Sequence, residues 1–263
     1  MTLVPVLMYH AVGRPLDDRF RRWVVSPSLL ADHLAAIKDA GYKLIGLSEW
    51  AAQTDAHKCV VLTFDDGYAD FIDSALPILT ANGARATVYV VTGYVGDRAR
   101  WLPFENERHR PIMGWEDLAM IQESGVEIGS HGHRHVELDS RPAAAAEGDV
   151  RQSRQALVER GFAPESFCYP FGYANRTVRD IVARAGFTTA CIVGRGLADS
   201  EQDLLRIRRV EVDHQTTPLA LLRRFHGPAV SASARIRAAA QPTWRQTRRL
   251  RAAARGLKAE AYQ

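Results

Sequence analysis

The sequence has few cysteines and no long apolar segment. Its three cysteines in 263 residues, Cys59, Cys168 and Cys191, form an odd and widely spaced set, which excludes a disulfide framework and a zinc ribbon. We expect them to be buried thiols of a protein in a reducing compartment. No apolar run is long enough to span a bilayer, and the first residues lack the charged and apolar parts of a signal peptide. A cytoplasmic location is therefore expected.

Most of the chain also lacks an excess of charge of either sign. The formal net charge is only +4, and basic residues gather after Arg235 in a tail whose single acid is Glu260. A near-neutral body does not indicate nucleic-acid binding. The tail, residues 231–263, is expected to be helical or disordered, and its charge allows peripheral contact with an anionic membrane. No obligate protein partner is expected.

Apolar strand-like runs alternate with helical patterns through residues 1–230, a length that is ordinary for one α/β domain. Ser26 precedes a proline as a helix N-cap, Ser48 is expected to cap a short helix, and a helix is expected over 70–82. The expected strands are residues 3–9, 43–47, 59–64, 86–91, 126–129, 167–169, 188–193 and 206–212. Such units predict a (β/α) barrel of parallel strands, whose catalytic groups follow the carboxyl ends of the strands. The stretch 93–111 lacks a pattern and is expected to be a loop.

One strongly apolar run ends on two carboxylates and a glycine, Asp65, Asp66 and Gly67. Adjacent side chains leave a strand end in different directions, so the two aspartates need not share one role. One can bind a metal while the other moves a proton. A turn in which both only cap backbone groups is the alternative, and the position after a buried strand of an expected barrel argues against it.

A second expected strand runs into histidines, with His131 and His135 four residues apart. In a helical turn this spacing places both imidazoles on one face, as two-histidine metal sites require, and directs His133 elsewhere. A solvated loop rich in histidine is the alternative. Together with the aspartates at another strand end, the pair favours a site of two histidines and one aspartate, which leaves a position for water at a catalytic metal.

A third apolar strand ends in a sharp change of direction at Pro170, Phe171 and Gly172. Backbone N–H groups of this segment are candidates to point into the site, and a plain turn with aromatic packing is the alternative. The functional interpretation therefore depends on the three segments together.

These segments, in this order, resemble the polysaccharide deacetylase family, the NodB-homology proteins of carbohydrate esterase family 4. Residues 63–67, Thr-Phe-Asp-Asp-Gly, match the first motif of the family in full, and the two histidines match its His-x-x-x-His motif. The segment 167–172 resembles the third motif, and the opening 6–10, Val-Leu-Met-Tyr-His, is similar to a branch that acts on exopolysaccharide. The resemblance covers roughly residues 3–225 and implies a distorted (β/α) barrel with about seven parallel strands.

By this resemblance, Asp66, His131 and His135 are the metal ligands and Asp65 is the general base. The resemblance also implies that the backbone of Phe171 helps to form an oxyanion hole. Zinc is the best match to such a ligand set, and cobalt, nickel or iron would fit it as well.

The sequence departs from the family at two places. Many members carry an arginine near the catalytic aspartate, two residues before the proline of the third motif, where this chain has Cys168. Arg209, before a late aliphatic strand, is the candidate for the missing charge. The late Leu-x-His motif, source of a general acid in many members, is not clearly present, and His10, His214 and His226 are candidates by position alone.

The function implied by the resemblance is the metal-dependent removal of acetyl groups from N-acetylated sugars. The expected substrate is a saccharide of the N-acetylglucosamine type, in polymeric, oligomeric or lipid-linked form. A related hydrolase of O-acetyl esters or small amides would use the same residues. A catalytically weak sugar-binding protein is the other class left open, since the arginine and the acid of the family are absent from their usual motifs.

Overall fold

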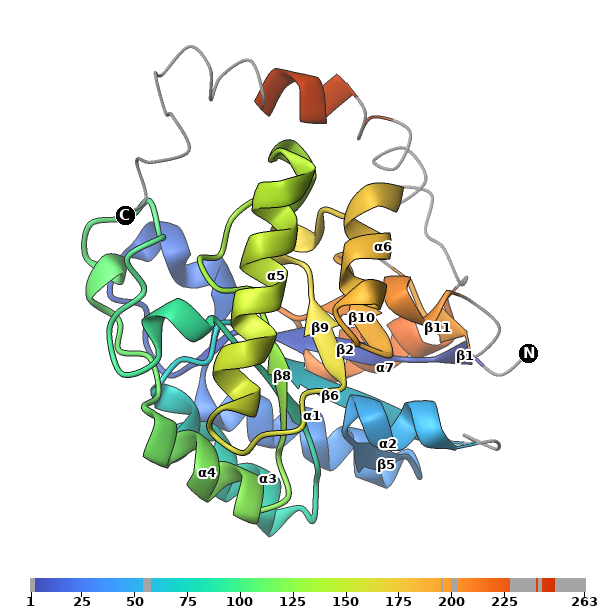
Figure 1. Ribbon diagram of the computed structural model, residues 1–263. Helices are drawn as coiled ribbons and strands as arrows, with labels where there is room; N and C mark the ends of the chain where they lie inside the picture. The colour runs from blue at the N-terminus through green and yellow to red at the C-terminus, as the bar shows by residue number, and fades with distance from the viewer. Residues whose placement is uncertain are drawn as a thin grey trace.

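The computed structural model describes residues 3–53, 58–194, 196–199, 203–227, 240 and 243–248. A curled parallel sheet with helices around it forms the body of the protein (Figure 1). The strands are β1 (Leu3–Val4), β2 (Val6–Tyr9), β3 (Ala11–Val12), β4 (Val24–Val25), β5 (Lys43–Ile45), β6 (Cys59–Phe64), β7 (Thr87–Val90), β8 (Glu127–Ser130), β9 (Ser166–Cys168), β10 (Thr189–Cys191), β11 (Ala198–Asp199) and β12 (Val210–Glu211). The helices are α1 (Pro27–Asp39), α2 (Leu47–Ala52), α3 (Leu76–Ala81), α4 (Trp115–Glu123), α5 (Ala143–Val158), α6 (Arg176–Arg184) and α7 (Pro218–Phe225). The short helical turns are η1 (Asp18–Trp23), η2 (Phe71–Ala75), η3 (Thr92–Tyr94), η4 (Glu107–His109), η5 (Leu138–Ser140), η6 (Pro170–Gly172) and η7 (Leu204–Arg206).

The main sheet is a strongly curled half-barrel in which all neighbouring strands are parallel. Seven strands follow the order β10-β9-β8-β7-β6-β2-β12, and β5 pairs with the first half of β6. The two edges meet at a seam, where Ile207 forms a parallel bridge with Cys191 and β12 pairs with β2. The predicted distorted barrel of about seven parallel strands is therefore confirmed. The predicted strand 206–212 is regular only over β12. Arg206 ends the turn η7, and Ile207 forms the isolated bridge of the seam.

Alternation along the strands separates the barrel interior from the layer under the helices. On β6, the even-numbered residues of 60–64 join the core cluster that α1, α3, α4 and α7 cover. Cys59 and Val61 belong instead to the interior cluster. The same alternation carries Thr63 and then Asp65 to the interior face, at the carboxyl end of the strand.

Local sequence signals account for most helix starts. Ser26 caps α1, where its hydroxyl accepts a hydrogen bond from a first-turn N–H at 3.1 Å. The prediction that Ser48 is an N-cap is wrong, because Gly46 occupies that position and the Ser48 hydroxyl donates to Glu127. The predicted helix 70–82 begins as the π-helical turn η2 and continues as α3.

Three further predictions concern the cysteines, the membrane and the tail. All three cysteines are free and buried, as predicted. In the part of the chain that the structure describes, no helix is both long and apolar enough to cross a bilayer. The tail 231–263 lies mostly outside the described residues, which include only residue 240 and the helical segment 243–248. The boundary at residue 230 and the lipid contact of the tail stay predictions.

Candidate active site and metal centre

Three buried side chains, Asp66, His131 and His135, converge at the carboxyl ends of β6 and β8. Nε2 of His131 lies 3.5 Å from Oδ1 of Asp66, and Nε2 of His135 lies 3.3 Å from the same oxygen. Two ligands bonded at about 2.1 Å to one tetrahedral metal are about 3.4 Å apart, so the spacing fits a shared divalent ion. Among the described residues, Oδ1 of Asp66 has no hydrogen-bond partner. A cation would satisfy this buried oxygen.

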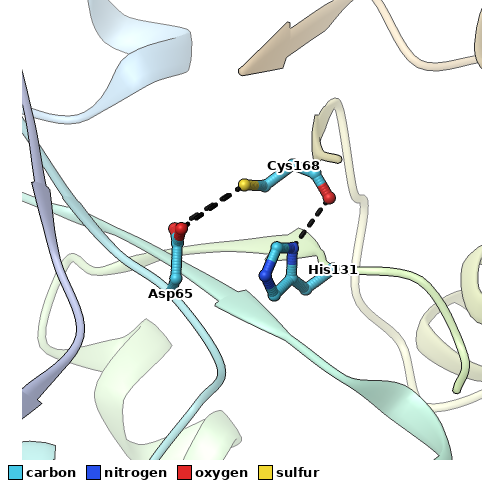
Figure 2. A group of neighbouring side chains, drawn as sticks. All are labelled: Asp65, His131 and Cys168. Atoms are coloured by element: carbon cyan, nitrogen blue, oxygen red, sulfur yellow. Dashed lines mark hydrogen bonds between the residues drawn. The ribbon is translucent and has the colours of Figure 1, made fainter. Parts of the chain in front are cut away.

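The hydrogen bonds of His131 prepare the ring for a metal. Its Nδ1 donates to the carbonyl oxygen of Cys168 at 2.7 Å (Figure 2), since a carbonyl only accepts. This bond fixes the tautomer and leaves the Nε2 lone pair directed toward Asp66. Burial lowers the pKa of His131 to about 4, so the ring is neutral at pH 7. A neutral imidazole tied to a carbonyl through its second nitrogen is the usual form of a histidine ligand.

An ionised carboxylate completes the cluster. Burial alone would raise the pKa of Asp66, but interactions with His135 and His131 outweigh burial and hold that pKa below its usual value. The cluster thus combines one anionic oxygen with two imidazole nitrogens, a donor set that divalent transition metals prefer.

Unusual backbone conformations concentrate at this site. Within the described residues, four non-glycine residues have left-handed φ angles: Lys58, Asp66, His135 and Phe171. Such conformations are uncommon outside glycine and cost about 1–3 kcal/mol each. Three of the four belong to the predicted site, so the surrounding fold holds these side chains in an orientation that relaxed backbone would not give.

An irregular loop brings the two histidines together. The expected helical turn between His131 and His135 is not formed, and His135 has a φ of 52°. Gly132, with a φ of 77°, allows the chain to reverse directly after β8. His133 points elsewhere, as predicted, and its Nδ1 hydrogen-bonds to the Thr92 hydroxyl at 3.0 Å.

Asp149 of α5 anchors this loop and was not predicted. Its carboxylate accepts hydrogen bonds from the N–H groups of His133 at 2.8 Å and Arg134 at 3.1 Å. A Cβ at Gly132 would lie only 2.9 Å from Oδ1 of Asp149, so the close approach requires glycine. An acid on the buried face of α5 was the available signal, since a buried carboxylate needs partners from elsewhere in the fold.

Asp65 and Arg209 form a buried bidentate ion pair. Nη1 of Arg209 lies 2.6 Å from Oδ1 of Asp65, and Nη2 lies 2.7 Å from Oδ2. The exposed fractions are 3% for Asp65 and 1% for Arg209. Burial alone would raise the pKa of Asp65, but the guanidinium outweighs it and holds that pKa below its usual value. Arg209 therefore lies beside Asp65, the place expected for the arginine that this chain lacks at position 168.

Cys168 also lies beside this pair. Its Sγ is 3.6 and 3.7 Å from the oxygens of Asp65 (Figure 2), and Nη2 of Arg209 donates to it at 3.1 Å. Burial raises the pKa of the thiol well above its usual value, so it is neutral. Asp65, His131 and Cys168 form a second group with ligand-like spacing. Both oxygens of Asp65 are already paired with Arg209, and Nε2 of His131 faces Asp66, so the first cluster is the better metal site.

Of the three candidate acids, the structure brings His10 to the site. It follows β2, its Nε2 lies 3.9 Å from Oδ2 of Asp65, and its ring packs against Trp23 at 4.8 Å between centroids. His214 lies in the turn after β12, and His226 is the C-cap of α7. Among the described residues, no hydrogen bond or ion pair links either ring to Asp65.

Aromatic rings flank the second histidine of the cluster. Phe171 contacts His135 at 4.6 Å between centroids, and Trp101 of the loop 93–111 does so at 5.0 Å. Phe171 has a φ of 59° and is 49% exposed. Gly172 follows with a φ of 72°, and a Cβ there would overlap Val193. The sharp turn predicted after β9 therefore places the ring of Phe171 beside the candidate metal cluster.

Fold and site together define an α/β-barrel protein with a buried cluster that fits a divalent metal. The sequence profile of the family described as Polysaccharide deacetylase matches residues 52–190, which are 139 of the 263 residues. The chain belongs to this family and is a hydrolase of its type.

Individual relatives agree with this assignment. The Bacillus subtilis (strain 168) protein YxkH, a polysaccharide deacetylase by name, is 24% identical over 216 residues, which are 80% of this chain and 71% of YxkH. The Streptococcus pyogenes deacetylase PplD, solved in complex with acetate, is 25% identical with a TM-score of 0.72, and the match covers 85% of this chain and 98% of PplD. IcaB from Ammonifex degensii, at 20% identity, has the same fold, with a TM-score of 0.70 over 86% of this chain and 97% of IcaB.

Proposed function

We propose that this protein hydrolyses the acetamide group of N-acetylated sugars of the N-acetylglucosamine type, in polymeric, oligomeric or lipid-linked form. The observation that carries the proposal is the ion-paired Asp65 directly beside the cluster of Asp66, His131 and His135. This arrangement separates a metal site from a proton acceptor, which amide hydrolysis requires. The names of the relatives, one of them a deacetylase solved with acetate, support the same chemistry.

Asp66, His131 and His135 would hold the metal, with zinc as the best match and cobalt, nickel or iron as alternatives. When bound, such an ion lowers the pKa of a coordinated water toward about 7 and polarises the acetyl carbonyl. Three protein ligands leave a coordination position open for this purpose.

Three groups of the chain would carry out the other steps: a base, an oxyanion donor and an acid. Asp65, kept ionised by Arg209, accepts a proton from the attacking water. The N–H of Phe171 donates a hydrogen bond to the oxyanion that develops on the acetyl group. His10 donates a proton to the departing amine, a role that its position 3.9 Å from Asp65 supports better than the position of His214.

Acetate release from a chitooligosaccharide, compared with release from an O-acetylated sugar, tests the proposal. We expect the amide to be the better substrate, activity to disappear with a chelator, and zinc to restore it. Turnover of the ester alone would replace the proposal with an esterase function. Saccharide binding by a metal-loaded protein without any acetate release would indicate the sugar-binding alternative.

A further inference from the structure

The described part of the basic tail contacts the chain next to the metal centre. The helical segment 243–248 is drawn in red above α5 in Figure 1. Arg248 forms a bidentate ion pair with Asp139, both distances being 3.0 Å, and pairs with Glu137 at 3.1 Å. These two acids lie shortly after His135 in the chain. The guanidinium therefore fastens the segment 243–248 to the residues that follow the loop of His131 and His135.

The same segment also contacts Tyr173, which directly follows the turn η6. The guanidinium of Arg248 lies 3.8 Å from the centroid of the Tyr173 ring, and Nε1 of Trp244 donates to the Tyr173 hydroxyl at 3.1 Å. Tyr173 stacks with Phe171 at 6.4 Å, and Phe171 contacts His135 at 4.6 Å. A continuous row of rings thus leads from a candidate metal ligand to the tail.

Burial differs sharply between the two tail residues. Arg248 is 7% exposed, whereas Trp244 is 42% exposed and Phe171 is 49% exposed. A buried guanidinium with a bidentate carboxylate and an aromatic ring is an anchor. Exposed indole and phenyl faces suit a pyranose ring, because its C–H face is apolar while its hydroxyls reach solvent. Since the charge of Arg248 is already paired with Asp139, it is not available to an anionic lipid.

We propose that the segment 243–248 forms part of the saccharide-binding site. This inference rests on the proposed deacetylase function. Trp244 and Phe171 bind sugar units beyond the unit that loses its acetyl group, and Arg248 is the positioning residue that holds the segment in place. The ligand class is an oligosaccharide of N-acetylated amino sugars longer than two units.

Chain-length dependence of the kinetics tests this subsite in the full-length, metal-loaded protein. Trp244→Ala should raise KM for the N-acetylglucosamine tetrasaccharide about five-fold, with kcat and the KM for the disaccharide unchanged. Trp244→Phe keeps a ring and should retain most of the affinity. Leu219→Ala is the matched control, since it truncates a side chain that is 60% exposed on α7, a helix packed against α1.

A second set of variants tests the anchor. Arg248→Met should reproduce the effect of Trp244→Ala on the tetrasaccharide, and Arg248→Lys should restore part of the affinity. Equal effects on both saccharides, or no effect on either, would overturn the proposal. An increase in kcat/KM with Arg248→Met would also overturn it, because the segment would then cover the site.

Calorimetric binding of the tetrasaccharide to Asp65→Asn separates this proposal from the proposed function. Affinity that falls with Trp244→Ala in this background, together with a wild-type protein that releases no acetate, would reject the deacetylase function and retain the subsite. Affinity that is unchanged by Trp244→Ala would reject the subsite, whatever the turnover.

Discussion

At the amino end of the barrel Glu127 has hydrogen-bond partners for both carboxylate oxygens, whereas at the carboxyl end Asp66 has a buried oxygen with no hydrogen-bond partner among the described residues. Oε1 of Glu127 accepts from the hydroxyls of Ser48 at 2.7 Å and Ser166 at 2.6 Å. Oε2 accepts from the Thr87 hydroxyl at 2.7 Å and from the N–H of Ser48 at 2.9 Å. Every oxygen of the first carboxylate has a hydrogen-bond donor without any ligand, whereas a cation would satisfy the free oxygen of the second. Hydrogen-bond satisfaction thus distinguishes an acid that supports the fold from one that we propose to be a metal ligand.

The largest effects are expected at the two adjacent aspartates. Asp66→Ala should abolish metal binding and reduce activity to background, because it removes the only anionic ligand of the cluster described here. Asp65→Asn should retain the metal and lose about 10²–10⁴-fold in kcat, since it removes the base. Metal content after dialysis and acetate release measure both results. Near-full activity of Asp65→Asn would refute the base assignment, and wild-type metal content in Asp66→Ala would refute the ligand assignment.

The ion pair of Asp65 should affect both stability and activity. Arg209→Met leaves a buried carboxylate without its counter-ion, so we expect a loss of about 3–5 kcal/mol in the free energy of unfolding, with lower kcat and retained metal. Denaturant unfolding and metal analysis check these outcomes. Arg206→Met changes an exposed arginine of the same segment and should stay within about 0.5 kcal/mol of wild type. Equal losses in the two variants would contradict the role assigned to the pair.

Substitution of Glu127 should affect stability and leave activity unchanged, in contrast to the two aspartates. Glu127→Gln weakens charge-assisted hydrogen bonds from Ser48, Thr87 and Ser166, so we expect a loss of about 1–2 kcal/mol in stability. Metal content and kcat should not change. The exposed Glu123→Gln is the control for stability. A large fall in kcat or in bound metal for a folded Glu127→Gln protein would remove the contrast between the two ends.

The smallest effect concerns His33, a second satisfied group away from the site. Its Nε2 donates to the carbonyl of Thr216 at 2.6 Å, and its Nδ1 accepts from the Tyr9 hydroxyl at 3.1 Å. Burial lowers the pKa of His33, so its contribution is fully present above the unfolded pKa of about 6.5 and is lost as the pH falls below it. His33→Gln should therefore lose less stability than wild type between pH 7 and 5. Urea unfolding at both pH values measures this difference, and His109→Gln, at an exposed histidine, should behave like wild type.

The sequence predicted those parts of the site that depend on one strand and its end. The interior position of Asp65 follows from alternation along β6, and the barrel follows from repeated strand–helix units. Arg209 lies 144 residues from Asp65 and was suggested by the family resemblance, because no local pattern relates positions so far apart. The left-handed backbone of His135 and the anchoring of its loop by Asp149 depend on packing between elements, which residue spacing does not encode.

The position of the barrel seam in the sequence also determines when the candidate active site can be completed during synthesis. Asp65 emerges early, but its counter-ion Arg209 lies between the Ile207 bridge and β12, which among the described residues form the last segment of the sheet in chain order. A growing chain therefore holds both aspartates and both histidines before it holds the guanidinium that pairs with the base. Closure of the seam is a late, non-local event, and catalytic competence should arise with it. The chain that emerges from the ribosome thus carries Asp65 and the candidate metal cluster before it carries Arg209.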